Sequence, residues 1–147
     1  MKILKRSTWD RAEIDRFLLE TTIPVRLAVI DDGVPLVASI WYQWDAEDGV
    51  LFCVSHQNAR IVRLLETGSS CGYEIARDDP PYKGVRGQGE VTLERARAGD
   101  VLDSLLRRYL GGTDSSLAQW LLGRIDEEVV LRIRPSWITS WDFSARM

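Results

Sequence analysis

The segment Ser55–Arg63 (SHQNARIVR) combines residue types suited to binding an anion. It lies between an apolar, strand-like run and a helical pattern, so free backbone N–H groups and the positive end of a helix would be available there. Ser55 and Asn58 add a hydroxyl and an amide, and Arg60 and Arg63 add fixed positive charge. The segment therefore predicts a phosphate site. The alternative is a capped surface helix whose two arginines are solvated.

A second segment, Asp79–Glu90 (DPPYKGVRGQGE), also suits a ligand. Its prolines stiffen the chain, its glycines allow close backbone approach, and Lys83 and Arg86 could meet a phosphate or the edge of a ring. The alternative is a proline turn that enters a glycine-bent strand. The glycine fingerprint of dinucleotide-binding domains and the P-loop are both absent, which argues against a Rossmann fold.

Aromatic residues gather in two strand-like stretches. Alternation places Tyr42 and Trp44 on one face of the first, and Trp137, Trp141 and Phe143 on one face of the second. Packing in the core or at a subunit interface is the favoured interpretation, because six tryptophans must mostly be buried. Some of these rings could still wall a flat ligand.

The sequence gives little support for metal or nucleophilic catalysis. His56 is the single histidine, and no serine or cysteine nucleophile motif accompanies it. A polar role in its loop and a contact to a ligand are both open for His56. Cys53 and Cys71 lie in apolar stretches and are expected to be buried thiols, not a disulfide. No metal site is expected.

Composition limits the possible partners. The 147 residues are 45% apolar and carry a net charge of −3, which is typical of one soluble domain spanning residues 1–147 and gives no strong field for nucleic acid. No apolar run approaches the roughly 20 residues of a membrane span. Residues 1–10 have no apolar core that would indicate a signal peptide. We therefore expect a cytoplasmic protein with no nucleic-acid or membrane partner.

The elements that would position these residues are mostly strands. Ser7 and Asp10 resemble a capping signal for a helix over about residues 8–20. Strands are predicted at 25–31, 34–44 and 50–54, joined by tight turns at 32–33 and 45–49. Such a succession is antiparallel.

The second half of the chain continues in the same way. Asn58 is predicted to cap a helix with one apolar face that ends at Gly68. Further strands are predicted at 70–76, 85–95, 127–134 and 136–143, with helices at 98–110 and 115–122. The pattern predicts a mainly β fold, a closed or nearly closed antiparallel barrel with helical covers. A parallel α/β sheet would need a regular alternation that is absent.

These motifs, taken together, resemble a known family. Five stretches, in order, are similar to the pyridoxamine 5′-phosphate oxidase-like superfamily of flavin-binding split β-barrels: Arg26–Val37, Trp41–Trp44, Leu51–Ser55, Asn58–Leu64 and Pro80–Gly87. The resemblance covers about residues 8–143. It implies a homodimer with two cofactor sites at the subunit interface, and FMN or the deazaflavin F420 as cofactor.

The resemblance also implies roles for particular residues. Ser55, Arg60 and Asn58 would contact the cofactor's phosphate, with Arg63 nearby. By the same resemblance, Lys83 and Arg86 would lie near the phosphate tail or the ring edge, and Trp41 with Tyr42 beside the isoalloxazine.

The chain departs from true pyridoxamine phosphate oxidases in lacking their longer C-terminal segment, so oxidation of vitamin B6 is not expected. The resemblance thus implies an FMN- or F420-dependent oxidoreductase that transfers hydride to a small-molecule substrate. The alternative is a non-catalytic flavin carrier or sensor of the same fold, and a weaker one is a structural dimer without ligand.

Overall fold

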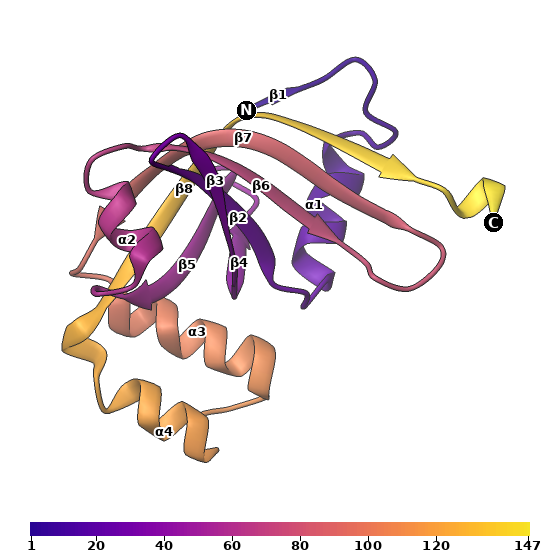
Figure 1. Cartoon of the computed structure of the whole chain (residues 1–147). Helices are drawn as coiled ribbons and strands as arrows, with labels where there is room; N and C mark the ends of the chain where they lie inside the picture. Colours follow the sequence, from indigo (N-terminus) through magenta and orange to yellow (C-terminus); the bar gives the residue numbers. More distant parts are fainter.

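One eight-stranded sheet, antiparallel apart from its first strand, makes up most of the structure, a computed structural model that describes residues 1–147 (Figure 1). The strands are β1 (Lys2–Ile3), β2 (Val25–Asp31), β3 (Val34–Ile40), β4 (Tyr42–Asp45), β5 (Val50–His56), β6 (Ser70–Ala76), β7 (Lys83–Glu94) and β8 (Glu128–Asp142). The helices are α1 (Arg11–Glu20), α2 (Arg60–Leu65), α3 (Ala98–Leu110) and α4 (Ser116–Leu122), with short 3-10 turns at Ile125–Glu127 and Ser144–Arg146. The predicted mainly β class is confirmed.

The sheet curls into a barrel that stays open at one seam. The strand order is β3-β2-β6-β7-β8-β5-β4, so β3 and β4 lie at opposite ends although only Trp41 separates them in the chain. They do not pair with each other, which leaves an edge of each unbonded. The prediction of one strand over 34–44 is therefore wrong: the chain leaves one end of the sheet at Trp41 and enters the other. The barrel is split, not closed.

The barrel interior holds the main core. Alternate residues of β2, β5 and β8 point inward, among them Leu27, Leu51 and Leu131, each 0% exposed. Ile14 and Leu18 of α1 pack into the same core. The observed cap lies three residues later than predicted: Asp10, not Ser7, makes a reciprocal capping box with Glu13.

A smaller core lies outside the barrel, beneath α3 and α4. Phe52 of β5 and Val130 of β8 pack against Val101 and Leu105 of α3. Both helices have the predicted bounds to within one residue, and Ser115, predicted as the first helical residue, is the N-cap of α4. In Figure 1 the two helices lie together below the barrel, at the end where β5 finishes and β8 begins.

The end of α1 is fixed by a side chain from α3. Arg108 donates hydrogen bonds to the carbonyl oxygens of Leu18, Leu19 and Thr21, which α1 leaves without helical partners. Its guanidinium also lies 5.2 Å from the centre of the Tyr42 ring. Arg108 thus links α3, which covers the smaller core, to Tyr42 of the barrel core.

The two longest strands, β7 and β8, run together across the barrel (Figure 1). Two strands were predicted at 127–134 and 136–143, but β8 is continuous and takes up the irregularity as a β-bulge opposite Gln88 and Gly89. Cys53 and Cys71 are buried free thiols, as predicted. No helix reaches the length and apolarity that crossing a membrane requires.

Candidate functional site

A cavity of 360 Å³ opens at the barrel seam and extends beneath the two helices outside the barrel. We call it the seam pocket; it is lined by Ser39, Ile40, Trp41, Val54, Ser55, His56, Leu102, Leu105, Leu117, Leu121, Arg124 and Glu128. Its volume lies in the range typical of small-molecule sites, and its wall is mostly apolar with a few polar groups. It contains two of the predicted site residues, Trp41 and Ser55.

The seam supplies unpaired backbone as well as side chains. The end of β3 is bonded to β2 on one edge only, and Val54–His56 of β5 is bonded to β8 on one edge only. These free edges line the seam pocket from both sides. Unpaired backbone N–H and C=O groups need partners, so the seam can bind the hydrogen-bonding edge of a flat ligand.

Strand alternation sorts the β5 and β8 side chains between the two sides of the sheet. Cys53 faces the barrel core, whereas Phe52 and Val54 face α3 and α4. On the same side, His56 lies opposite Glu128 in the ladder. The side chains of His56 and Glu128 therefore lie on the side of the sheet that α3 and α4 cover, in the seam pocket.

Of the two predicted ring contacts, only one lines the pocket. Trp41 lies in the wall, where its ring stacks on Tyr109 at 5.0 Å and 9°. Tyr42 is 0% exposed, and its hydroxyl donates to the carbonyl oxygens of Leu18 and Thr21. Burial raises the pKa of the Tyr42 phenol. The Tyr42 side chain therefore supports the wall from behind and does not line the pocket.

An arginine and a buried glutamate face each other in the pocket. Arg124 Nε lies 2.8 Å from Glu128 Oε1, but neither atom has a partner with hydrogen-bond geometry. Glu128 is 3% exposed, and the Arg124 guanidinium lies 3.8 Å from the centre of the Trp120 ring. The contact is an ion pair held in place by stacking, with directional hydrogen bonds unmade.

His56 lines the pocket with both ring nitrogens already engaged. Nδ1 accepts a hydrogen bond from the backbone N–H of Asn58 at 3.0 Å. Nε2 therefore carries the proton and donates it to Glu127 at 2.5 Å. Of the two roles left open by the sequence, the local polar role accounts for every hydrogen bond that His56 makes.

The predicted anion segment is exposed and carries its own counter-charge. Arg60 Nε donates to Asp31 Oδ2 at 2.5 Å, and this bond lowers the pKa of the Asp31 carboxyl. Arg63 Nη2 donates to Asn58 Oδ1 at 3.3 Å. Asn58 does not cap α2, since Ala59 occupies that position. Arg60, Arg63 and Asn58 lie beside the seam pocket in sequence but do not line it.

Lys83 and Arg86 lie on β7, away from the seam pocket, and alternation places them on opposite faces of the strand: Arg86 faces outward, whereas Lys83 is in phase with the buried Val85. Arg86 lies 5.0 Å from the centre of the Trp141 ring and opposite Glu74 in the ladder. Lys83 starts β7 opposite Asp142, whose pKa it helps to lower after the hydrogen bonds from Ser144. Neither residue lines the seam pocket. Within one chain, the predicted site residues therefore form two separate groups.

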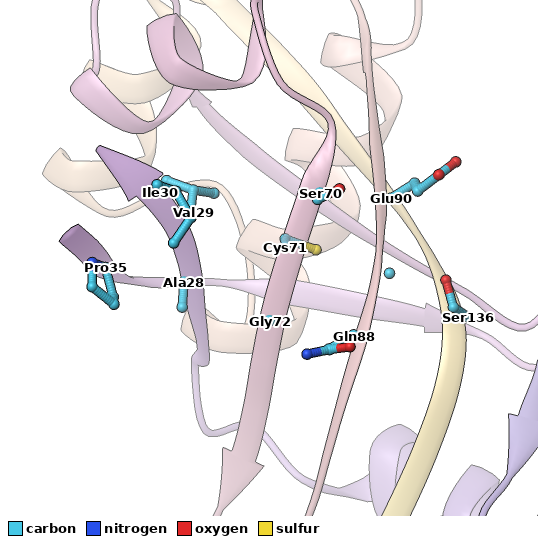
Figure 2. A pocket seen from close by; sticks show the side chains of 11 residues that line it. Ala28, Val29, Ile30, Pro35, Ser70, Cys71, Gly72, Gln88, Glu90 and Ser136 are labelled. Carbon is cyan, nitrogen blue, oxygen red and sulfur yellow. The ribbon is translucent and has the colours of Figure 1, made fainter. Parts of the chain in front are cut away.

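The outer face of β2, β6, β7 and β8 carries two adjoining grooves of 420 and 430 Å³. Both contain Ala28, Gly72 and Gln88, which lie side by side on three neighbouring strands (Figure 2). The small side chains of Ala28 and Gly72 leave the floor of the grooves open. Beside them the strands expose Ile30 and Val37 to 63% and 62%.

Several pocket residues were not predicted from the sequence. Arg124 falls between a predicted helix and a predicted strand, and Glu128 at the start of that strand, where charged residues are ordinarily solvated. Ser39 was placed inside a continuous strand. The leucines of α3 and α4 follow a helical period that indicates a buried face but not a pocket. The structure contains no group of three or more His, Cys, Asp or Glu side chains placed to hold a metal ion.

Comparison with known proteins adds to this geometry. The sequence matches no protein-family model and no curated protein. Among solved structures, a conserved hypothetical protein from Mycobacterium tuberculosis is 22% identical with a TM-score of 0.78, over 97% of this chain and 90% of that one. A structure described as an F420 reductase is 25% identical with a TM-score of 0.68, over 83% and 93% of the two chains.

A third structure, a putative pyridoxamine 5′-phosphate oxidase from Listeria innocua, is 15% identical with a TM-score of 0.68, over 91% of this chain and 98% of that one. These matches extend over 83–97% of this chain. The chain therefore shares the split-barrel fold of these solved structures, which include an F420 reductase and a putative pyridoxamine 5′-phosphate oxidase.

Proposed function

We propose that the protein binds a flavin-type cofactor, FMN or the deazaflavin F420, with its ring in the seam pocket. The observation that carries the proposal is the seam itself: two unpaired strand edges and an aromatic wall enclose 360 Å³ of mostly apolar space. The likeness to an F420 reductase supports a cofactor of this class.

The residues around the pocket fit such a group. Trp41 offers an apolar wall, and the free edges at Ser39 and Ser55 offer donors and acceptors. Arg60 and Arg63 lie just beyond Ser55 on α2 and supply the positive charge that a phosphate needs. We therefore assign the ring to the pocket, and the phosphate to the exposed segment beside it.

The protein would act as a homodimer. Neither Lys83 nor Arg86 lines the seam pocket of the same chain, and Arg86 lies on the outer face, so a second copy would have to bring these cations to the cofactor. The outer face suits a self-complementary contact, because it combines exposed apolar side chains with a row of alternating charge, Arg26, Glu74 and Arg86. No helix of the same chain lines its grooves.

The proposed activity is oxidoreduction of a small molecule. A bound flavin or deazaflavin supplies hydride transfer, and the protein's residues bind and orient the ring and exclude water from it. No residue of the pocket is needed as a nucleophile. His56 is committed to Glu127 and to the Asn58 backbone, so we assign it no proton transfer.

The second candidate is a flavin-binding carrier or sensor without turnover, favoured because the titratable groups of the pocket are paired, Glu128 with Arg124 and His56 with Glu127. Stopped-flow reduction of the cofactor-loaded protein by NAD(P)H, or by reduced F420, followed by reoxidation with quinone and nitroaromatic acceptors, separates the two. An oxidoreductase passes the electrons on in repeated cycles. A carrier or sensor binds the cofactor but shows no catalytic cycle with any acceptor.

A further inference from the structure

Only three buried side-chain polar atoms in the protein lack a hydrogen-bond partner, and two of them lie in the seam pocket. These are Arg124 Nε and Glu128 Oε1; the third is Nε of Arg108, whose guanidinium lies 5.2 Å from the centre of the Tyr42 ring. Buried polar atoms without partners are rare in folded proteins. In the pocket they mark an ion pair whose hydrogen bonds are incomplete.

The two atoms cannot satisfy each other as they stand. Nε and Oε1 are 2.8 Å apart, but the N–H direction does not meet hydrogen-bond geometry. Stacking on Trp120 at 3.8 Å holds the guanidinium plane. Nε and Oε1 are themselves covered, but no hydrogen bond engages the Arg124 Nη atoms or Glu128 Oε2, so the pair keeps donor and acceptor capacity towards the pocket on those atoms.

No other polar side chain that lines this side of the pocket is free to meet the pair. His56 lies opposite Glu128 in the ladder, but its nitrogens are bound to Glu127 and to the Asn58 backbone. The neighbouring side chains from α3, α4 and β5 are apolar: Leu102, Leu105, Leu117, Leu121 and Val54. A ligand group that reaches the pair must therefore supply the complementary donor and acceptor itself.

We propose that Arg124 and Glu128 bind the imide edge of the ligand's ring. An N–H of the ring donates to the Glu128 carboxylate, and the adjacent C=O accepts from the Arg124 guanidinium. The proposal rests on the proposed function and deepens it: the pyrimidine end of both flavin and deazaflavin rings carries an N–H between two carbonyl groups. The recognition is thus the same for FMN and F420.

The test uses lumiflavin, which has the ring but no phosphate, and 3-methyllumiflavin, in which a methyl group replaces that N–H. Binding of each to the full-length protein is measured by fluorescence titration. Lumiflavin should bind roughly tenfold or more tightly than its 3-methyl derivative, because methylation leaves the buried carboxylate unpaired. FMN and F420 are titrated in parallel.

The variant Arg124→Leu with Glu128→Leu removes both groups, and apolar replacement of a buried pair is often tolerated by the fold. Its affinity ratio between the two probes should fall to about one. Arg132→Leu with Glu94→Leu is the matched control, because that ion pair of 3.8 Å lies off the pocket. The control should keep the wild-type ratio. Thermal melts verify folding, and Glu128→Gln, which keeps the shape, should lower the ratio several-fold.

Equal binding of the two probes to the wild type, or an unchanged ratio in the double-leucine variant, overturns the inference. If FMN or F420 still binds in that case, the proposed function stands, and only the role of Arg124 and Glu128 in binding the imide edge is wrong. If none of the four ligands binds, the proposed function fails together with the inference.

Discussion

Arg60, the cation expected to hold a phosphate, is hydrogen-bonded from the start of α2 to Asp31 at the end of β2, with Nε 2.5 Å from Oδ2. The pair is exposed, with 69% of the Arg60 side chain accessible. A phosphate at this position must compete with a carboxylate or share the arginine with it. Asp31 therefore reduces the attraction of the segment for an anion of high charge.

Asp31→Asn should strengthen binding of FMN by roughly two- to fivefold and leave riboflavin unchanged, because only FMN carries the phosphate. Arg60→Glu should weaken FMN in the same assay, again without effect on riboflavin. Fluorescence titration measures the affinity of each protein for FMN and for riboflavin. Asp32→Asn is the control, as it removes a neighbouring exposed carboxylate that makes no hydrogen bond to Arg60. Equal effects on FMN and riboflavin would contradict the phosphate assignment.

The outer sheet face should hold the dimer together. Val37→Glu places a charge at an exposed apolar position beside Ala28, where we expect the second copy, and should shift the protein from dimer to monomer in light scattering. Leu19→Glu is the control, since Leu19 is 48% exposed on α1. The control should remain dimeric. A wild type of monomeric mass at all concentrations would rule out the dimer.

Gly87 should tolerate no side chain. A Cβ built there would lie 2.4 Å from the Tyr73 hydroxyl and would collide with the backbone oxygen of Trp137. Gly87→Ala should therefore lower the free energy of unfolding by about 2–3 kcal/mol or prevent folding. Gly99→Ala, in α3 with nothing within 4 Å, should raise it by about 0.5 kcal/mol. Urea unfolding measures the free energy of unfolding of both variants. An unchanged value in Gly87→Ala would show that the Tyr73 side chain can move away from the new methyl group.

Cys71 should make stability depend on pH in the alkaline range. Burial raises the pKa of its thiol from 9.0 to about 11. Because the folded protein disfavours the thiolate, the contribution of Cys71 is complete below pH 9 and is lost as the pH rises towards 11. Between pH 8 and pH 10 the free energy of unfolding should fall by about 1.3 kcal/mol from this cause.

The unfolding free energy of Cys71→Ala should therefore fall less than that of the wild type between pH 8 and 10, by about that amount. Urea titrations at the two pH values measure the difference. Cys53 stays in both proteins and serves as the internal control, since its pKa is also raised by burial. Identical declines would mean that the Cys71 thiolate is accommodated in the fold.

Local pattern was enough to predict most of the elements. The apolar alternation of β2 and β6, the helical period of α3 and the Ser115 cap all have signals within a few residues. The break at Trp41 has none, because its cause is the switch between opposite ends of the sheet. The continuity of β8 likewise depends on its pairing with β7 across the bulge.

The residues of the seam pocket could be predicted only in part, because contacts between distant segments of the chain bring many of them together. Ser55 and Trp41 belong to stretches whose order resembles a family, and both line the pocket. The burial of Glu128 depends on helices that the sequence shows but does not place. The engagement of Arg60 by Asp31 joins residues on separate elements, and no spacing rule connects them. Side-chain partners distant in sequence require the three-dimensional structure.

The most direct test of the account is equilibrium titration of the purified protein with FMN and with F420, in the wild type and in Ser39→Trp. Ser39 is exposed at the pocket mouth, so a tryptophan there should fill the space that the ring needs. Thr92→Trp, at an exposed strand position off the pocket, is the control. We predict saturable binding of one cofactor to the wild type and control, and weakening by roughly tenfold or more in Ser39→Trp. Absence of binding by both cofactors, or unchanged affinity in Ser39→Trp, would contradict the assignment of a flavin-type cofactor to the seam pocket.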